Sequence, residues 1–331
     1  MKEYVKRDAN LPTLTVVTPT YNQADFLRDT IESVLSQDYP NIEYVVLDDG
    51  STDDTAKILA EYGDPFTWET QKNMGQTATI NKGWAMTKGE IITWLNSDDT
   101  FYDATSVSTG IDYLLKNPDV GVVFGDSMFT EADGTEIEPT RPIIDFTYKK
   151  FILNCENPVS QPSSFIRREV IEKIGVLDPK FYYLMDWNFW MKVGLYFKME
   201  HIDEILSTYR LHADSKTVAH AKKGASELEY MYEKFFERDD IPEEIRAVEK
   251  EAMMNMCFTS GGYYLRGDDD KNAAKMAAKA FEYYPKGKYQ KANLHKYLYC
   301  RFGNSSIYRK SRSLYQGSSM SQIDNQRFKN D

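Results

Sequence analysis

Two pairs of adjacent aspartates, at positions 48–49 and 98–99, each follow a short apolar run of the sequence. Carboxylates in an acidic chain would repel a pyrophosphate unless a divalent cation lay between them. Mg²⁺ and Mn²⁺ are commonly held by one or two carboxylates together with substrate phosphates. The two pairs therefore indicate a site where Mn²⁺ or Mg²⁺ assists the binding of a nucleotide diphosphate.

The apolar runs that precede these residues predict strands of an α/β fold. They are short and rich in β-branched residues, and helical patterns lie between them; they are 13–18 (TLTVVT), 42–47 (IEYVVL), 91–95 (IITWL) and 120–124 (VGVVF). Such an alternation favours a mostly parallel sheet with helices on both faces. Ligands of these sheets bind beyond the carboxyl ends of the strands, where the aspartate pairs fall.

Polar residues are expected to start the helices of this half of the chain. Asn22 and Asp103 each precede an apolar face at helical spacing, and Ser51 with Asp54 resembles a capping box. A further helix is expected at 76–87. No GxGxxG follows a strand and no GxxxxGK[ST] is present, so neither a dinucleotide site nor a P-loop is supported.

Six motifs follow one another between Leu14 and Lys216. They are TPTYN at 18–22, DDGSTDDT at 48–55, WLNSDD at 94–99, QPSSFIRREV at 161–170, YYLMDWNFW at 182–190 and YRLH at 209–212. Together they resemble the family 2 glycosyltransferases, which have the GT-A (Rossmann-like) fold and invert the sugar that they transfer. No Gln-x-x-Arg-Trp motif is present, so the resemblance is to non-processive, bacterial polysaccharide-type members.

The resemblance implies which residues bind the sugar donor. Asp49 would accept a hydrogen bond from a uracil-like base, and Asp98 would lie near the ribose or the metal. The other residues expected to line the nucleotide sugar are Thr18, Pro19, Tyr21, Gly75, Gln76 and Asn96.

The resemblance also implies the metal ligands and the catalytic residue. Asp99 would ligate the metal directly, with Asp98 beside it, and His212 would add a contact to the metal or the diphosphate. Asp186 occupies the position of the general base. The residues expected on the acceptor side are Gln161, Ser163 and Trp187.

These residue types suit a single displacement. A cation stabilises the charge that builds on the leaving diphosphate, and a carboxylate on the opposite face accepts the proton of the attacking hydroxyl. The anomeric configuration then inverts. Two positions depart from the family pattern: Asn96 stands where many relatives have Asp, and Met185 stands where the base motif often has Glu.

Each motif also has a purely structural interpretation. The aspartate pairs could serve only as turns and helix caps, Asp186 could only begin an amphipathic helix, and His212 could be a structural histidine. Segment 161–164 could be a loop that enters a strand.

At the level of function, a nucleotidyltransferase also uses paired carboxylates and metal, but would normally show a basic, glycine-rich loop near its N-terminus. A catalytically silent glycan-binding or scaffold protein is the alternative from another class.

Composition narrows the class of protein. The chain has 331 residues, is 41% hydrophobic and carries a formal net charge of −11, which argues against general nucleic-acid binding. Its three cysteines, Cys155, Cys257 and Cys300, are too few and scattered for a disulfide framework and fit a reducing cytoplasm. Neither a signal peptide nor a membrane-spanning run is recognisable. We expect a cytoplasmic protein that could also attach peripherally to the inner face of the cytoplasmic membrane.

The C-terminal third differs in organisation. We expect a GT-A domain over 1–218, with a donor half to about 125 and an acceptor half after it, then a helical region over 219–316 and a polar, poorly ordered tail over 317–331. Three helices are expected in the helical region, at 227–237, 243–265 and 272–284.

A basic segment follows those helices. Between Glu282 and Asp324 there is no acidic residue, while basic and aromatic residues alternate over 286–315. This composition favours contact with anionic lipid. A solvated basic face, an acidic partner subunit or a homo-oligomer contact is the alternative.

The function favoured by the sequence is therefore sugar transfer. The donor would be a UDP-sugar, with a dTDP-sugar as the alternative, and the transferred group would be of hexosyl or N-acetylhexosaminyl type. The acceptor would be a hydroxyl of a glycan or of a lipid-linked molecule. Assembly of a bacterial cell-envelope polysaccharide is the expected setting, by family analogy alone.

Overall fold

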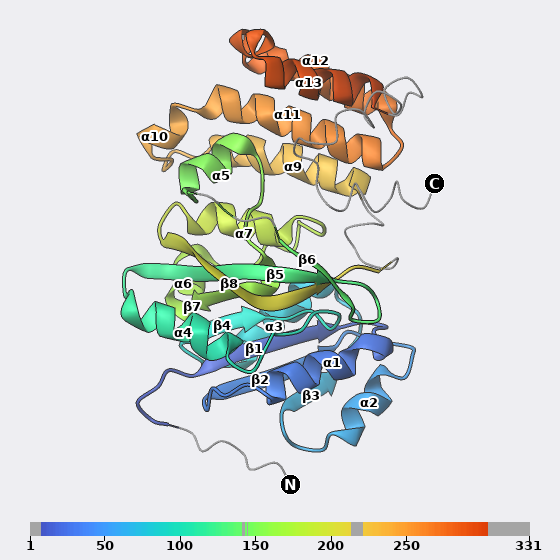
Figure 1. Cartoon of the computed structure of the whole chain (residues 1–331), viewed down its shortest axis with the longest axis vertical. Coiled ribbons are helices and arrows are strands. Elements are labelled where there is room, and N and C mark those ends of the chain that lie inside the picture. Colours follow the sequence, from blue (N-terminus) through green and yellow to red (C-terminus); the bar gives the residue numbers. More distant parts are fainter. Residues whose placement is uncertain (1–7, 141–142, 144, 213–220, 304–331) are drawn as a thin grey trace. The chain divides into compact units, whose positions relative to one another are not determined.

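The computed structural model describes residues 8–140, 143, 145–212 and 221–303. The chain forms two compact units, each described here by itself. The sheet unit comprises residues 1–148 and 157–212, and the helical unit comprises 149–156 and 213–331. Figure 1 follows the chain from the strands of the first unit to the helices of the second.

The sheet unit is built on one eight-stranded sheet with the order β3-β2-β1-β4-β7-β5-β6, in which β8 also pairs with β5. The half that carries the aspartate pairs is parallel and consists of β1 (Leu14–Thr20), β2 (Ile42–Asp48), β3 (Thr67–Thr70) and β4 (Ile91–Trp94). The other half is mixed and consists of β5 (Val120–Thr130), β6 (Glu136–Pro139), β7 (Ser164–Arg167) and β8 (Lys198–Arg210). β7 joins the halves by running antiparallel to both β4 and β5.

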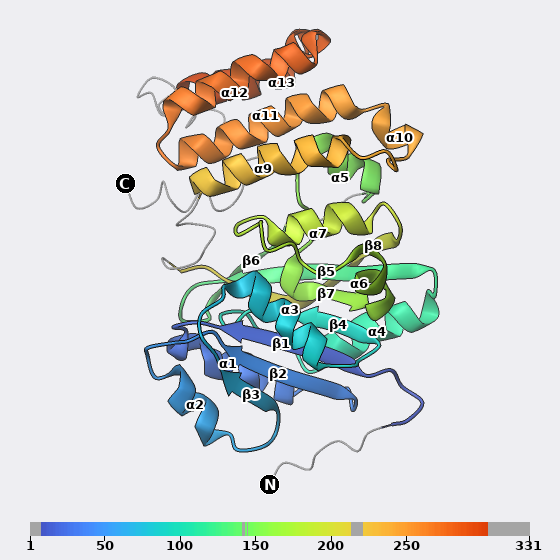
Figure 2. The ribbon, with the colours of Figure 1, turned by 180° about the vertical axis from the view of Figure 1, so that it is seen from behind.

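Helices cover both faces of this sheet, as the two views in Figures 1 and 2 show. One face carries α1 (Ala24–Leu35), α2 (Thr55–Glu61) and α4 (Ser106–Lys116), whose apolar residues share one core cluster with Leu14 and Val16 of β1. The other face carries α3 (Gln76–Met86) and α7 (Met185–Val193), with α6 (Arg168–Ile174) beside α7. The expected α/β fold is confirmed.

Strand alternation explains why β1 serves both layers. Val16 joins the α1 side, and Val17, one residue on, faces the α3 side. A Cβ added to Gly83 of α3 would lie 2.5 Å from Cγ1 of Val17, so a glycine is required for helix and strand to approach this closely. On the α3 side, Trp94 of β4 packs edge-on against Trp84 and stacks on Trp190 of α7.

The expected helix caps are wrong in detail. The residue before α1 is Gln23, and Asn22 lies in the left-handed region with a φ of 52°. Neither Ser51 nor Asp54 makes a side-chain capping bond to α2, which is preceded directly by Asp54. Asp103 instead closes a turn before α4, where its Oδ1 accepts a hydrogen bond from the Thr105 backbone N–H at 2.8 Å. These polar residues stabilise loops because their side chains are engaged elsewhere: Asn22 and Ser51 bond between two loops, and Asp103 bonds within its own turn.

The helical unit contains α9 (Ala221–Phe236), α10 (Glu243–Arg246), α11 (Glu249–Arg266), α12 (Asp270–Tyr283) and α13 (Lys291–Phe302). It also holds most of α5 (Tyr148–Asn154), because Tyr232 and Asn255 donate side-chain hydrogen bonds to the α5 carbonyls of Ile152 and Leu153. The single helix expected over 243–265 is two, since the chain turns between α10 and α11. α13 was not expected from the sequence.

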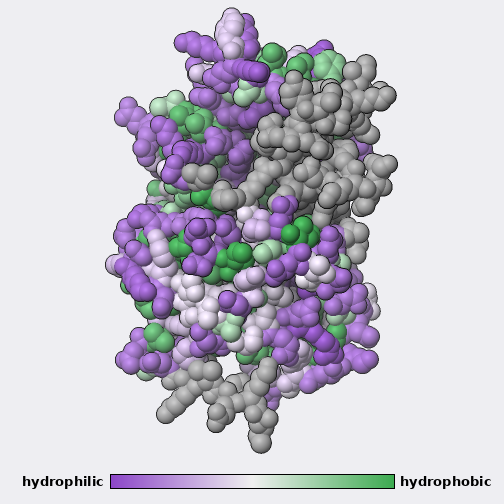
Figure 3. All heavy atoms as spheres, viewed as in Figure 1, coloured by the Kyte–Doolittle hydropathy of each residue, from purple (hydrophilic) through white to green (hydrophobic). Residues whose placement is uncertain are grey.

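On the face shown in Figure 3, hydrophilic side chains predominate and hydrophobic ones gather in small groups. None of the helices in the described part of the chain is long and apolar enough to cross a bilayer. The tail expected over 317–331 lies outside the described residues, as does 304–315 of the basic segment.

Candidate active site

The tips of β1 and β2 are tied together by Asn22. Its side-chain oxygen accepts the Thr52 backbone N–H at 2.8 Å, and its own backbone N–H donates to Oγ of Ser51 at 2.8 Å. Tyr21, just before it, has 49% of its surface exposed. The predicted nucleotide residue Thr18, in contrast, is fully buried within β1, with its hydroxyl 3.1 Å from Oη of Tyr44.

Asp49 holds the loop that leads into α3. Its Oδ1 accepts from Nε2 of Gln71 and from the Met74 backbone N–H, both at 2.9 Å, and its Oδ2 accepts from the Gly75 N–H at 2.8 Å. Gly75 has a φ of 87°, a conformation that favours glycine, and a Cβ there would meet open space. Asp49 thus fixes Gly75 and places Gln76 at the start of α3, on the same edge of the sheet.

The second aspartate pair lies beyond β4 and meets the end of β8. Oδ2 of Asp98 is 3.0 Å from Nε2 of His212, whose side chain is 6% exposed. Asp99 is buried; its Oδ1 accepts the Arg210 backbone N–H at 3.1 Å, and its Oδ2 accepts from Nδ2 of Asn96 at 3.2 Å. The structure therefore brings together the three residues predicted as metal ligands.

The chemistry of this tip suits a divalent cation. Burial, together with the neighbouring Asp98 carboxylate, raises the pKa of Asp99 well above its ordinary value, and a bound cation would relieve that repulsion. Nδ1 of His212 is buried and has no hydrogen-bond partner among the described residues. Within the same residues no group of three or more His, Cys, Asp or Glu is arranged to hold a metal. A cation here would need further oxygen ligands, which substrate phosphates can supply.

Asn96 connects the donor residues to the acceptor segment. Its Oδ1 accepts a hydrogen bond from Nε2 of Gln76 at 2.7 Å. Its Nδ2 donates to Oδ2 of Asp99 and lies 3.3 Å from Oε1 of Gln161. Gln161 begins a 3₁₀ turn and also donates to the Trp94 carbonyl at 2.7 Å. An amide fits this position because it donates to Asp99 and accepts from Gln76, whereas a carboxylate could only accept.

The predicted base, Asp186, lies in the first turn of α7 and is held by Asn157. Oδ2 of Asp186 accepts from Nδ2 of Asn157 at 3.1 Å, and Oδ1 of Asn157 accepts the Val159 N–H at 3.1 Å, which fixes the direction of the amide. The hydroxyl of Thr77, next to Gln76, lies 3.0 Å from Sδ of Met185. The start of α7 is therefore attached to the start of α3.

Two residues expected on the acceptor side are part of the protein interior. Ser163 is fully buried and donates to the Asp126 carbonyl at 3.0 Å, within a cluster that includes Ser127 and Ser207. Trp187 is 4% exposed. Burial leaves Ser163 and Trp187 almost no surface for an acceptor, whereas Gln161 lies beside Asn96.

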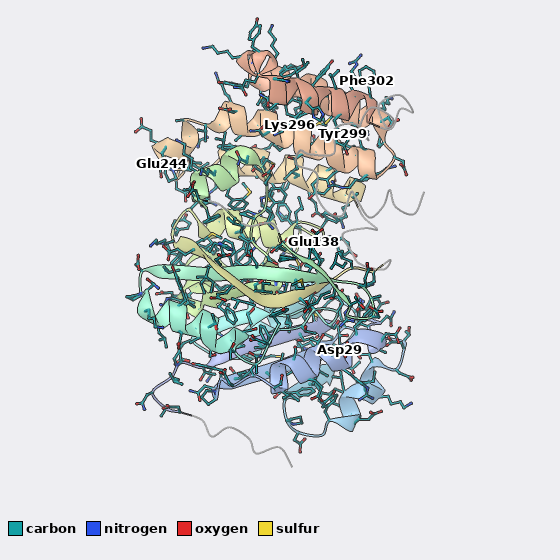
Figure 4. All side chains as sticks on the ribbon, in the orientation of Figure 1. Asp29, Glu138, Glu244, Lys296, Tyr299 and Phe302 are labelled. Atoms are coloured by element: carbon teal, nitrogen blue, oxygen red, sulfur yellow. The ribbon has the colours of Figure 1, made fainter. Side chains whose placement is uncertain are left out.

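Arg210 has no role assigned from its motif, yet the structure places it behind the Asp98-Asp99 tip. It is 5% exposed, and its guanidinium donates to the carbonyls of Asp98 at 2.9 Å and Ala132 at 2.8 Å. It also pairs with Asp29 of α1, labelled in Figure 4, at 2.8 Å. Arg210 lies within the YRLH motif, but only the folded chain shows that it supports the Asp98-Asp99 tip.

We expect Arg210→Met to destabilise the protein. The variant keeps an apolar side chain near Phe26 but removes the donor to the partly buried carbonyls of Asp98 and Ala132, which should lower the free energy of unfolding by about 1–3 kcal/mol. Arg28→Met is the matched control, because its ion pair with Glu61 is about half exposed, and little change is expected. Urea unfolding of both variants measures the difference. Equal stability would show that Arg210 does not support the tip.

The sequence of this chain is similar to those of known proteins. Residues 15–175 match the family described as "Glycosyl transferase family 2". An uncharacterised glycosyltransferase of Rickettsia typhi is 28% identical over 240 residues, which cover 71% of this chain and 74% of the relative. One of Rickettsia prowazekii is 28% identical over 222 residues, covering 64% and 68%.

Solved structures show the same fold. Staphylococcus aureus TarS 1–349, solved in complex with UDP-GlcNAc, has a TM-score of 0.63 at 16% identity and covers 93% of both chains. The mannosyltransferase PcManGT from Pyrobaculum calidifontis, in complex with GDP-Man and Mn²⁺, has a TM-score of 0.59 at 16% identity, covering 96% of this chain and 91% of that one. At such identities the likeness concerns the fold alone.

Proposed function

This chain carries a family 2 glycosyltransferase domain with the GT-A fold, and on that premise we propose that it transfers a sugar from a UDP-sugar to an acceptor hydroxyl with inversion. The observation that carries the proposal is the chain of contacts between the two predicted halves of the site. Asn96 reaches from Asp99 to Gln161, and Thr77 reaches from the start of α3 to the start of α7. A carboxylate pair suited to a cation and a separate carboxylate suited to a base are thus joined through one framework.

The donor half would bind the nucleotide diphosphate. Asp98, Asp99 and His212 would hold Mn²⁺ or Mg²⁺, which when bound supplies electrostatic stabilisation to the departing diphosphate. Tyr21 offers an exposed ring for the base, and the loop fixed by Asp49 borders the same edge. Three hydrogen bonds already engage the Asp49 carboxylate, so its predicted contact with a uracil-like base would use the acceptor capacity that remains on Oδ2.

The acceptor half would supply the base. Asp186 would accept the proton of the attacking hydroxyl, and Asn157 would hold the carboxylate in place through its amide. A neutral amide donor stabilises the ionised form of a carboxylate, which is the form that a base requires. In this chain Met185 replaces the Glu that often precedes the base, and Asn157 would orient the base instead.

The identity of the donor rests on chemistry shared with the solved relatives. TarS is described in complex with UDP-GlcNAc and PcManGT with GDP-Man, so both bind nucleoside diphosphate sugars. We favour UDP over GDP because the DDGS tip resembles that of uracil-binding members, with dTDP as the alternative. A hexose or N-acetylhexosamine would be transferred to a glycan or lipid-linked acceptor, in the assembly of a cell-envelope polysaccharide.

A thermal-shift screen of nucleotides tests the donor class. UDP with Mn²⁺ should raise the melting temperature by about 5 °C at a hundredfold excess over Kd, and UDP without metal should raise it much less. A larger shift with GDP would overturn the choice of base. A larger shift with UTP would favour a nucleotidyltransferase, and no shift with any nucleotide would favour a glycan-binding or scaffold protein.

A further inference from the structure

The described part of the helical unit carries a basic surface that the proposed reaction does not use. No acidic residue occurs between Glu282 and Asp324, and the described part of this stretch comprises the turn Pro285–Tyr289 and helix α13. Lys286, Lys288 and Lys291 are exposed there. None of the three forms an ion pair with a carboxylate of the described residues.

Some basic residues elsewhere in the helical unit do form ion pairs, although others, such as Lys250 and Lys275, are exposed without one among the described residues. Lys234 pairs with Glu237, Lys279 with Glu233 at 3.4 Å, and Arg246 with Glu249 at 3.1 Å. The contrast is a property of the sequence, since α9 to α12 carry interspersed acids and α13 carries none. The positive charge around α13 is therefore not neutralised within the described chain.

Helix α13 also exposes apolar side chains along one face. Asn293 and Cys300 turn inward, and Cys300 lies so close to α11 that a Cβ on Gly261 would be 2.7 Å from its sulfur. Leu294 and Leu298, one helical turn apart, remain 47% and 37% exposed. Tyr289 in the preceding turn is 81% exposed, and Figure 4 labels Lys296, Tyr299 and Phe302 along the same helix.

Exposed leucine and tyrosine flanked by unpaired lysines suit the boundary of an anionic bilayer. Apolar side chains enter the headgroup region, and each basic residue near the surface improves binding roughly fivefold. A second copy of the chain fits less well, because a two-fold contact would bring the lysines of both copies together. The few exposed apolar side chains also offer much less than the roughly 800 Å² per partner that a stable protein interface buries.

We propose that the α13 face, defined as Lys286, Lys288, Tyr289, Lys291, Leu294 and Leu298, binds an anionic phospholipid surface. The interaction would be peripheral, with the leucines and the tyrosine at the headgroup boundary and the lysines on the lipid phosphates. It is independent of sugar transfer, so either proposal can fail without the other.

Sedimentation of the full chain with lipid vesicles tests the proposal. The protein should pellet with vesicles of equal parts phosphatidylcholine and phosphatidylglycerol at low salt, pellet less at high salt, and remain in solution with phosphatidylcholine alone. Replacing Lys286, Lys288 and Lys291 by Gln should weaken binding on the order of 10²-fold. Leu294→Ser with Leu298→Ser should weaken it at low salt as well, because these exposed side chains would no longer enter the headgroup region.

Matched changes on another helix serve as the control. Leu115 is 46% exposed and the Lys116 side chain 76%, both in α4 of the sheet unit, and Leu115→Ser with Lys116→Gln should leave vesicle binding unchanged. All variants should keep the UDP-dependent thermal shift, which separates this proposal from the function of the site. Wild-type protein that stays in the supernatant at low salt would overturn the proposal. So would a dimer, measured by light scattering, that the double serine variant abolishes, because the α13 face would then be a subunit contact.

Discussion

Asp186→Asn is expected to lower kcat by about 10²-fold or more while leaving the KM for the donor nearly unchanged. Asparagine keeps the shape of aspartate but cannot accept the proton of the attacking hydroxyl, and that transfer typically contributes a factor of 10²–10⁴. Asp186 lies on α7, where Asn157 of the acceptor half holds it, and it is not among the residues proposed to bind the metal or the nucleotide, so donor binding should survive. Steady-state kinetics with the identified donor and acceptor measure both parameters.

Asn157→Ala provides a graded companion to that variant. It keeps the base but removes the amide that holds it, so we expect a smaller fall in kcat, about tenfold, with the donor KM again unchanged. NMR of the product should show an anomeric configuration opposite to that of the donor. Near-normal turnover by folded Asp186→Asn would remove the base from the proposal, and retention of configuration would exclude single displacement.

Asp99→Asn is expected to abolish the metal-dependent part of nucleotide binding and nearly all transfer. A cation between carboxylate and diphosphate contributes several kcal/mol of charge stabilisation, which the neutral amide cannot supply. EDTA should have the same effect on the wild-type protein. Isothermal titration of UDP in the presence of Mn²⁺, with and without the substitution, measures the loss.

Stability separates this effect from damage to the fold. A carboxyl group whose pKa is raised by burial reduces stability at pH values above its unfolded-state pKa, and Asn carries no such penalty. Asn also lacks one of the two oxygens that accept from Arg210 and Asn96, and this loss offsets the removal of the buried charge, so metal-free Asp99→Asn should unfold within a few degrees of the wild-type protein. Asp103→Asn, a change in a nearby turn, should leave UDP binding intact. If UDP binds the wild-type protein equally well with and without metal, the assignment of Asp99 is wrong.

The donor side of the fold could be predicted because its determinants are local. β1, β2 and β4 are short, mostly buried runs rich in β-branched residues, so their positions and the polar residues at their carboxyl ends can be read from the sequence. β8 (Lys198–Arg210) is different, because many of its residues are polar and only partly buried. Its pairing with β5 also depends on residues about 80 positions away in the sequence. Long-range pairing of this kind leaves no periodic pattern to recognise.

The roles of single site residues depended on burial, which local sequence does not determine. Thr18, Ser163 and Trp187 belong to family motifs, yet the folded chain encloses them almost completely. Asn157 stands in an Asn-Pro turn, a pattern that marks a loop but not what the loop contacts. Its hydrogen bond to Asp186 bridges 29 residues of sequence and appears only in the structure.

Release of UDP from a panel of UDP-sugars, with and without Mn²⁺, tests the central proposal most directly. The wild-type protein with an acceptor glycan should release UDP from one or a few UDP-hexoses or UDP-N-acetylhexosamines, and only when the metal is present. Asp99→Asn and Asp186→Asn should both release almost none, the first because the diphosphate is not stabilised and the second because the hydroxyl is not deprotonated. Equal release with and without Mn²⁺, or undiminished release by either folded variant, would contradict the metal-assisted transfer proposed here.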